Sequence, residues 1–220
     1  MTGPSAMERA ARAAALGHGA RINAEQQREL EALVRSDDDA RVRSAALSAL
    51  VRGAAHRFAV ATWRVAATDP DRTVRRRAAE LAPALGTAAP AQAVLTLLAD
   101  PEPLVAEAAA FALGERARPG PRAIAALSAA ATAHEDPLVR EAAVAALGAL
   151  GDPGTLAVVL AACDDKPAVR RRAVLALAAF DGPEVEARLK TALTDRDWQV
   201  RQAAEDLLGT DETNETNELA

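Results

Sequence analysis

The sequence has one cysteine, no tyrosine and only five aromatic residues among 220. The single thiol, that of Cys163, excludes an internal disulfide and a cysteine-based metal cluster. Cys163 stands among small apolar residues with no base nearby in the sequence, so we interpret it as a buried side chain rather than a nucleophile. With so few aromatic side chains, the chain has few bulky residues on which to build one deep core.

Histidine is also scarce, and the three histidines share no metal-ligand spacing. They are His18, His56 and His134. The motifs of phosphate-binding, dinucleotide-binding, zinc-hydrolase and serine-hydrolase sites do not occur in the sequence. We therefore expect no metal, no cofactor and no enzymatic activity.

Long apolar runs are missing as well. No run reaches the roughly 18 apolar residues that a membrane-spanning helix needs, and the first ten residues lack the apolar core of a signal peptide. The net charge is −5, which disfavours general binding to nucleic acid because such binding needs a basic face. These features predict a cytoplasmic protein that has no membrane partner and is a monomer on its own.

Alanine is abundant, at 59 of 220 residues, and it is the best helix former and lets helices pack closely. A Val-Arg pair also recurs at intervals of 30 to 34 residues. Its six occurrences are Val42-Arg43, Val74-Arg75, Val105-Ala106, Val139-Arg140, Val169-Arg170 and Val200-Arg201, with Ala106 in place of one arginine. A period of this length indicates a stack of repeated structural units.

Each of these valines opens a predicted amphipathic helix. Small or apolar residues follow at the fourth, seventh and eighth positions, as Ala143, Ala146 and Leu147 do after Val139, which places them on one helix face. The residue three before the valine fits a helix N-cap, because a carboxylate there can accept a free backbone N–H. These residues are Asp39, Asp71, Glu102, Asp136, Lys166 and Asp197. A preceding helix is predicted in each unit, over 24–36, 55–68, 90–99, 121–133, 154–163 and 183–194.

The pattern D-x-D-x-x-V-R-x-x-A-x-x-A-L, clearest from Asp136 to Gly148, resembles the HEAT repeat, above all the short HEAT-like repeats of the phycobilin-lyase type. The resemblance covers 24–209 and implies an all-α fold, an α-α superhelix (a HEAT/armadillo-like solenoid) of about six two-helix repeats. We expect 1–20 to be an N-terminal capping segment with a helix from Ala6 to Leu16. The repeat array then covers 21–209, and 210–220 forms a disordered polar tail.

Three departures interrupt the pattern. Ala106 replaces an arginine, Lys166 replaces an acid, and the stretch 116–121 lengthens one spacing. Neutral drift and a functional irregularity both stay open as explanations.

In HEAT-like repeats the arginine of the Val-Arg pair commonly bonds an aspartate of an inter-helix turn, so the resemblance implies a structural ladder along the stack. Acids are available to these arginines within their own repeats. The expected members are Asp39, Arg43, Asp71, Arg75, Asp136, Arg140, Arg170, Asp197 and Arg201. Binding of a partner or an anion by these arginines is the alternative.

Additional arginines and a few aromatic residues are candidates for partner binding. By the resemblance, the second helix of each repeat lines the concave face, where Arg76-Arg77 and Arg171-Arg172 would form two basic spots. The full set is Arg76, Arg77, Phe111, Arg140, Arg171, Arg172 and Trp198. For Trp63, in a predicted first helix, core packing is the first interpretation and partner contact the second.

The sequence favours a protein–protein interaction scaffold or adaptor that presents a concave helical surface to a partner protein with an acidic surface. Two alternatives stay open. One is a nucleic-acid-binding protein resembling the HEAT-like DNA alkylpurine glycosylases, and the other is an enzyme subunit of the chromophore-lyase type. Scarce aromatic residues and negative charge weigh against the first, and the lack of tyrosine weighs against the second.

Overall fold

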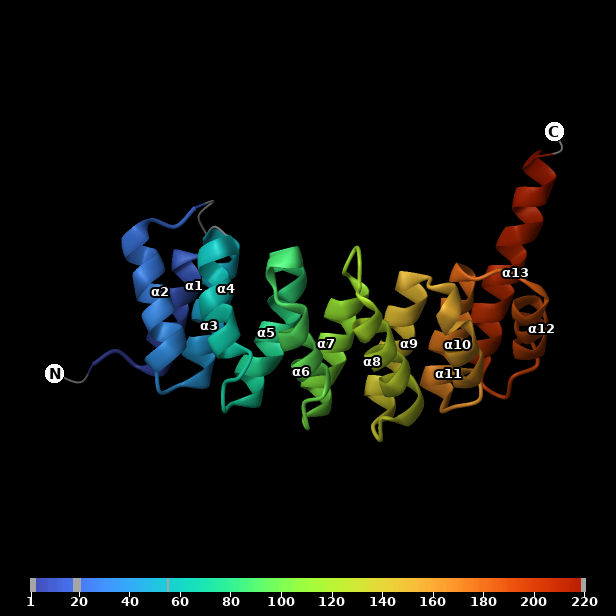
Figure 1. Ribbon diagram of the computed structural model, residues 1–220, viewed down its shortest axis with the longest axis horizontal. Helices are drawn as coiled ribbons and strands as arrows, with labels where there is room; N and C mark the ends of the chain where they lie inside the picture. Colours follow the sequence, from blue (N-terminus) through green and yellow to red (C-terminus); the bar gives the residue numbers. More distant parts are fainter. Residues whose placement is uncertain (1–2, 18–20, 55, 219–220) are drawn as a thin grey trace. The chain divides into compact units, whose positions relative to one another are not determined.

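The computed structural model describes residues 3–17, 21–54 and 56–218 (Figure 1). Within these ranges the chain forms thirteen α-helices and three short 3-10 helices, with no strand. The all-α fold that the repeat pattern predicts is thereby confirmed. The α-helices are α1 Ala6–Leu16, α2 Ala24–Ser36, α3 Ala40–Gly53, α4 His56–Ala66, α5 Arg72–Leu85, α6 Ala91–Leu98, α7 Pro103–Gly114, α8 Pro121–Ala133, α9 Pro137–Leu150, α10 Leu156–Ala162, α11 Pro167–Ala176, α12 Pro183–Ala192 and α13 Trp198–Glu218. The 3-10 helices are η1 Gly86–Ala88, η2 Pro153–Thr155 and η3 Leu177–Ala179.

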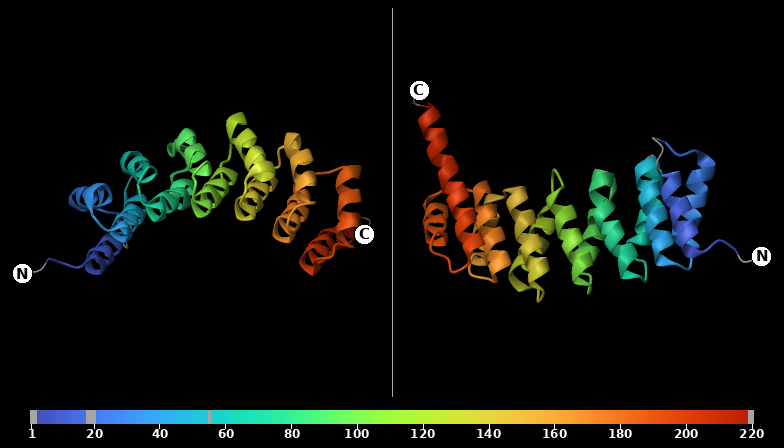
Figure 2. Two further views of the ribbon diagram at one scale, coloured as in Figure 1. Left: turned by 90° about the horizontal axis from the view of Figure 1, so that it is seen from below. Right: turned by 180° about the vertical axis from the view of Figure 1, so that it is seen from behind.

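The chain divides into two compact units, unit 1 (Met1–Arg116) with α1 to α7 and unit 2 (Ala117–Ala220) with α8 to α13. In each unit the helices alternate between two layers (Figure 2). The A helices are α2, α4 and α6 in unit 1 and α8, α10 and α12 in unit 2. The B helices are α1, α3, α5 and α7 in unit 1 and α9, α11 and α13 in unit 2. Successive B helices of a unit pack side by side, and each A helix packs on the B helix that follows it. The six A–B pairs correspond to the six expected repeats, and α1 adds one unpaired B helix.

The B helices begin where the N-cap pattern predicts. Asp39, Asp71 and Asp136 cap α3, α5 and α9, and each carboxylate accepts the N–H of the second residue beyond it. A proline opens α7, α9 and α11, at a position where its missing N–H removes no hydrogen bond. Local sequence therefore sets the start of each of these helices.

The repeated valines and alanines form the core. Val42 and Ala46 of α3 are fully buried, and the equivalent pair is buried in every later B helix. Small side chains let neighbouring B helices approach closely, and a glycine lies at one such approach. A methyl group on Gly148 of α9 would lie 2.6 Å from the Cβ of Ala176 in α11, which is closer than two carbons can pack.

Trp63 lies in the core between α4 and α5. Its side chain is fully buried, and its indole N–H donates to the carbonyl oxygen of Ala78, 2.7 Å away. A buried indole needs such an acceptor. Core packing, the first interpretation of Trp63, is therefore correct, and this side chain is not available to a partner.

At the two ends, helices occupy the segments for which the sequence predicts a cap and a tail. α1 has the bounds of the expected capping helix and packs on α3. α13 continues to Glu218, so its last turns coincide with most of the predicted polar tail. Residues 1–2 and 18–20 of the capping segment and 219–220 of the tail lie outside the described residues.

Candidate functional site

Four arginines of the Val-Arg pairs each join two consecutive repeats. In unit 1 the Nε and Nη2 of Arg43 donate to the carboxylate of Asp69, both at 2.8 Å, while its Nη1 donates to the carbonyl oxygens of Asp37 and Asp38. A planar guanidinium matches a carboxylate in this two-bond geometry. We call each such pair a rung. The same fork joins Arg75 to Asp100 in unit 1, and Arg140 to Asp165 and Arg170 to Asp195 in unit 2.

The aspartates of the rungs are not those that the sequence predicts. The prediction paired each arginine with an acid of its own repeat, and that pairing is wrong. The arginine reaches the turn of the following repeat instead, because the first turn of one B helix packs beside the next B helix. The predicted acids serve as caps, each accepting the N–H two residues further along. They are Asp39, Asp71, Asp136 and Asp197.

Repeats three and four lack this pair of residues in the sequence. Ala106 stands at the arginine position of repeat three, and His134 stands at the aspartate position of repeat four. His134 keeps the turn, because its Nδ1 accepts the N–H of Asp136 as the carboxylate of Asp69 accepts that of Asp71. An imidazole cannot offer two oxygens to a guanidinium fork. The missing arginine is therefore matched by a missing aspartate.

One further rung lies outside the sequence prediction. Arg9 of α1 donates through Nε and Nη2 to Asp37, at 2.8 and 2.9 Å. Arg9 stands four residues after the N-cap Ser5, as Arg43 stands four residues after Asp39. The N-cap spacing is the signal that could have identified it, since no valine precedes Arg9. α1 is thus joined to the first repeat in the same way as consecutive repeats within each unit are joined.

The rungs of the repeats are largely shielded from water. Their arginine side chains are between 5% and 16% exposed. Hydrogen bonds from Arg140 and Arg170 hold the pKa values of Asp165 and Asp195 below the usual range, although burial acts in the opposite direction. Arg140 also donates Nη1 to two carbonyl oxygens of its own turn, so all its nitrogens are engaged. Arg140 is therefore a ladder residue, and its prediction as a partner-binding residue is wrong.

Arg76 and Arg77 border a hollow between α3 and α5. The hollow has a volume of about 500 Å³ and is lined also by Arg41, Ser44, Ser48 and Thr73. Both arginines bond the same carboxylate, that of Glu80, at 2.9 and 2.8 Å, and each side chain stays 45% exposed. The hydroxyl of Ser44 is buried and has no hydrogen-bond partner in the described part of the chain. Two guanidinium groups that share one carboxylate leave an excess of positive charge, which can bind an acidic group from another molecule.

Leu104 and Phe111 continue this surface on the neighbouring helix α7. Phe111 is 56% exposed and Leu104 is 49% exposed. Leu104 is the second residue after its N-cap, as Arg41 is in α3, and Phe111 is the ninth, as Glu80 is in α5. Equivalent positions face the same side of neighbouring B helices. We call the combined set the B-helix surface of unit 1: Arg41, Arg76, Arg77, Leu104 and Phe111.

In unit 2 the predicted partner residues other than Arg140 lie on α11 and α13. Arg171 and Arg172 lie 3.8 and 3.5 Å from Glu141 of α9, and their side chains are 35% and 37% exposed. Trp198 is 64% exposed in the first turn of α13. The predicted set is therefore divided between the two units.

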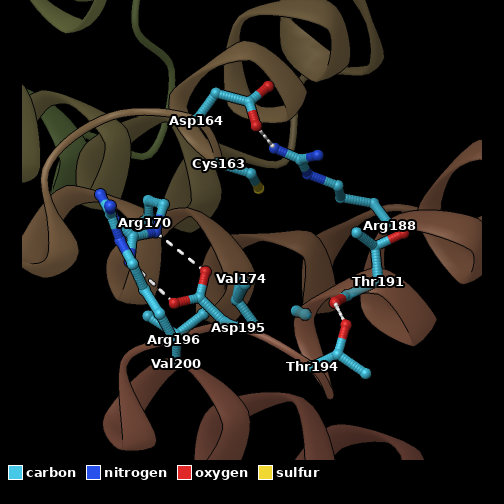
Figure 3. Close-up of a pocket in the computed structure, with 11 residues that line it drawn as sticks. Cys163, Asp164, Arg170, Val174, Arg188, Thr191, Thr194, Asp195, Arg196 and Val200 are labelled. Carbon is cyan, nitrogen blue, oxygen red and sulfur yellow. Dashed lines mark hydrogen bonds and ion pairs between the residues drawn. The ribbon is translucent and has the colours of Figure 1, made fainter.

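Cys163 lies in the wall of a cavity of about 370 Å³ in unit 2 (Figure 3). The side chain is buried, and burial raises the pKa of the thiol, which is therefore protonated at neutral pH. Arg188 is paired with Asp164 and Arg170 with Asp195, and Arg196 also lines the cavity. This environment fits the interpretation of Cys163 as a small buried side chain.

Residues 3–17, 21–54 and 56–218 hold neither a metal-ligand cluster nor a membrane-spanning helix. Over these ranges, no three His, Cys, Asp or Glu side chains gather as metal ligands. No helix there combines the length and the apolar character that crossing a bilayer requires.

Known proteins share this architecture. The family profile of HEAT repeats matches residues 91–168 and 163–210, which together span more than half of the chain. The Escherichia coli protein YIBA_ECOLI is similar in structure, with a TM-score of 0.69 and 20% identity over 94% of this chain and 78% of its own. A designed armadillo repeat protein, solved in complex with the peptide (KR)4, has a TM-score of 0.59 and 18% identity over 84% of this chain and 98% of its own. No curated protein sequence matches the chain. The structural likenesses show the fold, and the family profile shows that the chain belongs to the HEAT-repeat family.

Proposed function

We propose that this chain is a protein-interaction scaffold whose B-helix surface in unit 1 binds a partner segment with both acidic and apolar side chains. The role is one of binding and not of catalysis, and its expected place is the cytoplasm. Repeat arrays suit this task because their stacked units create extended surfaces without a closed cavity.

The observation that carries the proposal is the exposed pair Leu104 and Phe111 beside the arginine-lined hollow. These two large apolar side chains are about half exposed and lie two turns apart on one face of α7. A partner that covers them removes apolar surface from water, which is favourable. Arg76 and Arg77 each keep 45% of the side chain exposed and share one internal carboxylate. An acidic group of the partner would meet these arginines while its apolar group covers Phe111.

The designed armadillo repeat protein supports the general form of this proposal. It is solved in complex with the peptide (KR)4, so a helical array of similar fold binds a basic peptide. The surface here has the opposite requirement, because its own charged residues are mainly arginines. Charge complementarity thus favours an acidic peptide.

Selection of peptides from a random displayed library on the full chain tests this. We expect the selected peptides to combine Asp or Glu with Leu, Phe or Trp. Synthetic copies should bind at least tenfold more weakly to Arg76→Gln/Arg77→Gln and to Phe111→Ala. Arg64→Gln and Val65→Ala on helix α4 are matched controls, because both residues are exposed in the A layer. Selection of basic peptides, or equal affinity for all four variants, would contradict the proposal.

A further inference from the structure

Arg201 is the ladder arginine of the last B helix, and it holds only half of a rung. Its Nη1 donates to the carbonyl oxygen of Asp195 at 2.8 Å, as the other ladder arginines donate to their own turns. In the four rungs of the repeats, Nε and Nη2 bond an aspartate of the following repeat. For Arg201, no acceptor of Nε or Nη2 occurs among the side chains that the structure describes. The two-bond side of this guanidinium is open.

The rest of the molecule shows what such an open side binds. In each rung of the repeats, the Nε and Nη2 of the arginine donate to the carboxylate of an aspartate in the turn before a B helix. The same carboxylate also fixes its own turn, since Asp69 accepts the N–H of Asp71 at 2.8 Å and Asp195 accepts that of Asp197 at 2.8 Å. The preferred ligand is thus a turn-forming aspartate, with a carboxylate already held in place.

Trp198 belongs to the same end face. It precedes Arg201 by three residues, so both side chains leave α13 on the same side. In α5 the equivalent residue of Trp198 is Arg72, which reaches Glu102 of the following repeat at 3.1 Å. The position therefore faces the place of a following repeat. Trp198 is 64% exposed there, and Trp and Arg are the residue types that most often carry binding energy at interfaces.

A further stacked repeat does not fit this face. Four residues after the ladder arginine, the internal B helices bury an apolar side chain, and in α13 this residue is the exposed Glu205. The buried equivalents are Leu47, Ala79, Val144 and Val174. Stacking another B helix would bury a carboxylate without a partner. A second copy of the chain does not supply the aspartate from the turn before its α1 either. Asp69 stands two residues before the N-cap Asp71, and the equivalent residue before the N-cap Ser5 is Gly3.

We infer that the end face formed by Trp198 and Arg201 docks a partner protein through an aspartate held in a tight turn. This site is separate from the B-helix surface of unit 1, and its test does not depend on that surface.

Two synthetic peptides serve as probes for NMR titration of the ¹⁵N-labelled full chain. One has the sequence of residues 67–74, the turn that fills the fork of Arg43, and the other has Asn in place of Asp69. The two tryptophans give an internal comparison, because Trp63 is buried and Trp198 is exposed. At millimolar peptide we expect saturable shifts of the Trp198 indole and Arg201 Nε–H signals and none of the Trp63 indole. The Asn peptide should bind at least tenfold more weakly.

Variants of the chain separate fork recognition from simple charge attraction. Arg201→Gln should abolish the shift of Trp198, and Arg201→Lys should weaken binding about tenfold, because an ammonium group cannot form two parallel bonds. Lys190→Gln, an exposed charge on α12, is the control and should change nothing. Equal binding of the two peptides, a shift that persists in Arg201→Gln, or no saturable shift would each overturn the inference.

Discussion

The Nε of Arg140 lies 2.6 Å from a carboxylate oxygen of Asp165, and the two residues belong to consecutive repeats. The guanidinium also bonds two carbonyl oxygens of its own turn, so one side chain joins two repeats. Removing it leaves Asp165 and those carbonyls partly buried without their donor.

We therefore expect Arg140→Gln to lower the free energy of unfolding by about 3 kcal/mol. Arg122→Gln, at an exposed position of α8, should change it by less than about 0.5 kcal/mol. Urea unfolding followed by circular dichroism measures both. Equal values for the two variants would show that the rung contributes no more than a surface charge.

Acid should weaken the ladder. The pKa values of Asp165 and Asp195 lie below the ordinary value of 3.8 in the folded chain, because each carboxylate accepts hydrogen bonds from an arginine. The stabilisation is complete above that ordinary value and is lost as the pH falls through the lower, folded pKa. Unfolding free energies between about pH 5 and pH 2 should fall more steeply in the wild type than in Asp165→Asn. Asp181→Asn, at an exposed position, should keep the wild-type slope, and a steep slope in Asp165→Asn would refute the linkage.

Two glycines of helices in unit 2 should respond to alanine with opposite signs. A methyl group on Gly148 would lie 2.6 Å from the Cβ and 2.9 Å from the Cα of Ala176, whereas one on Gly209 would meet nothing within 4 Å. Gly148→Ala should cost about 1–3 kcal/mol through overpacking. Gly209→Ala should gain about 0.5–1 kcal/mol because alanine loses less backbone entropy in a helix. Thermal unfolding of both variants decides this, and a stabilised Gly148→Ala would mean that α9 and α11 pack less closely.

The two tryptophans should differ in fluorescence. Trp63 is fully buried and Trp198 is 64% exposed. Trp198→Phe should leave short-wavelength emission that acrylamide quenches weakly, and Trp63→Phe should leave emission that acrylamide quenches strongly. Trp63→Phe should also cost about 1–3 kcal/mol, since it removes buried volume and the hydrogen bond to Ala78. Similar quenching in the two variants would place both indoles in similar surroundings.

The repeat pattern predicts most of the fold because its signals are local. The N-cap Asp39 and the buried Val42 and Ala46 act within one helix, so their spacing specifies where that helix starts and which face it buries. The partner of Arg43 does not follow from local sequence, because acids stand both in the turn before its own helix and in the turn of the following repeat. Sequence spacing does not say which of them the side chain reaches, and only the packing of α3 against α5 selects Asp69.

The candidate site was predicted less well for a related reason. Phe111 is among the predicted partner residues, and it is exposed. Leu104 is also about half exposed, but it stands directly before the core residue Val105, where a leucine resembles a core residue in sequence. The open side of Arg201 is invisible in the sequence, because its Val-Arg pair looks like the others. What distinguishes it is that, among the described residues, no aspartate of another turn accepts from its Nε and Nη2.

Chemical-shift mapping of a selected acidic and apolar peptide on the full chain tests the B-helix surface most directly. The largest changes should fall on Arg76, Arg77, Leu104 and Phe111 of α5 and α7, with the A helix α4 unaffected. If the largest changes fall on the A helices, or if no selected peptide shifts α5 and α7, the proposed binding surface is contradicted.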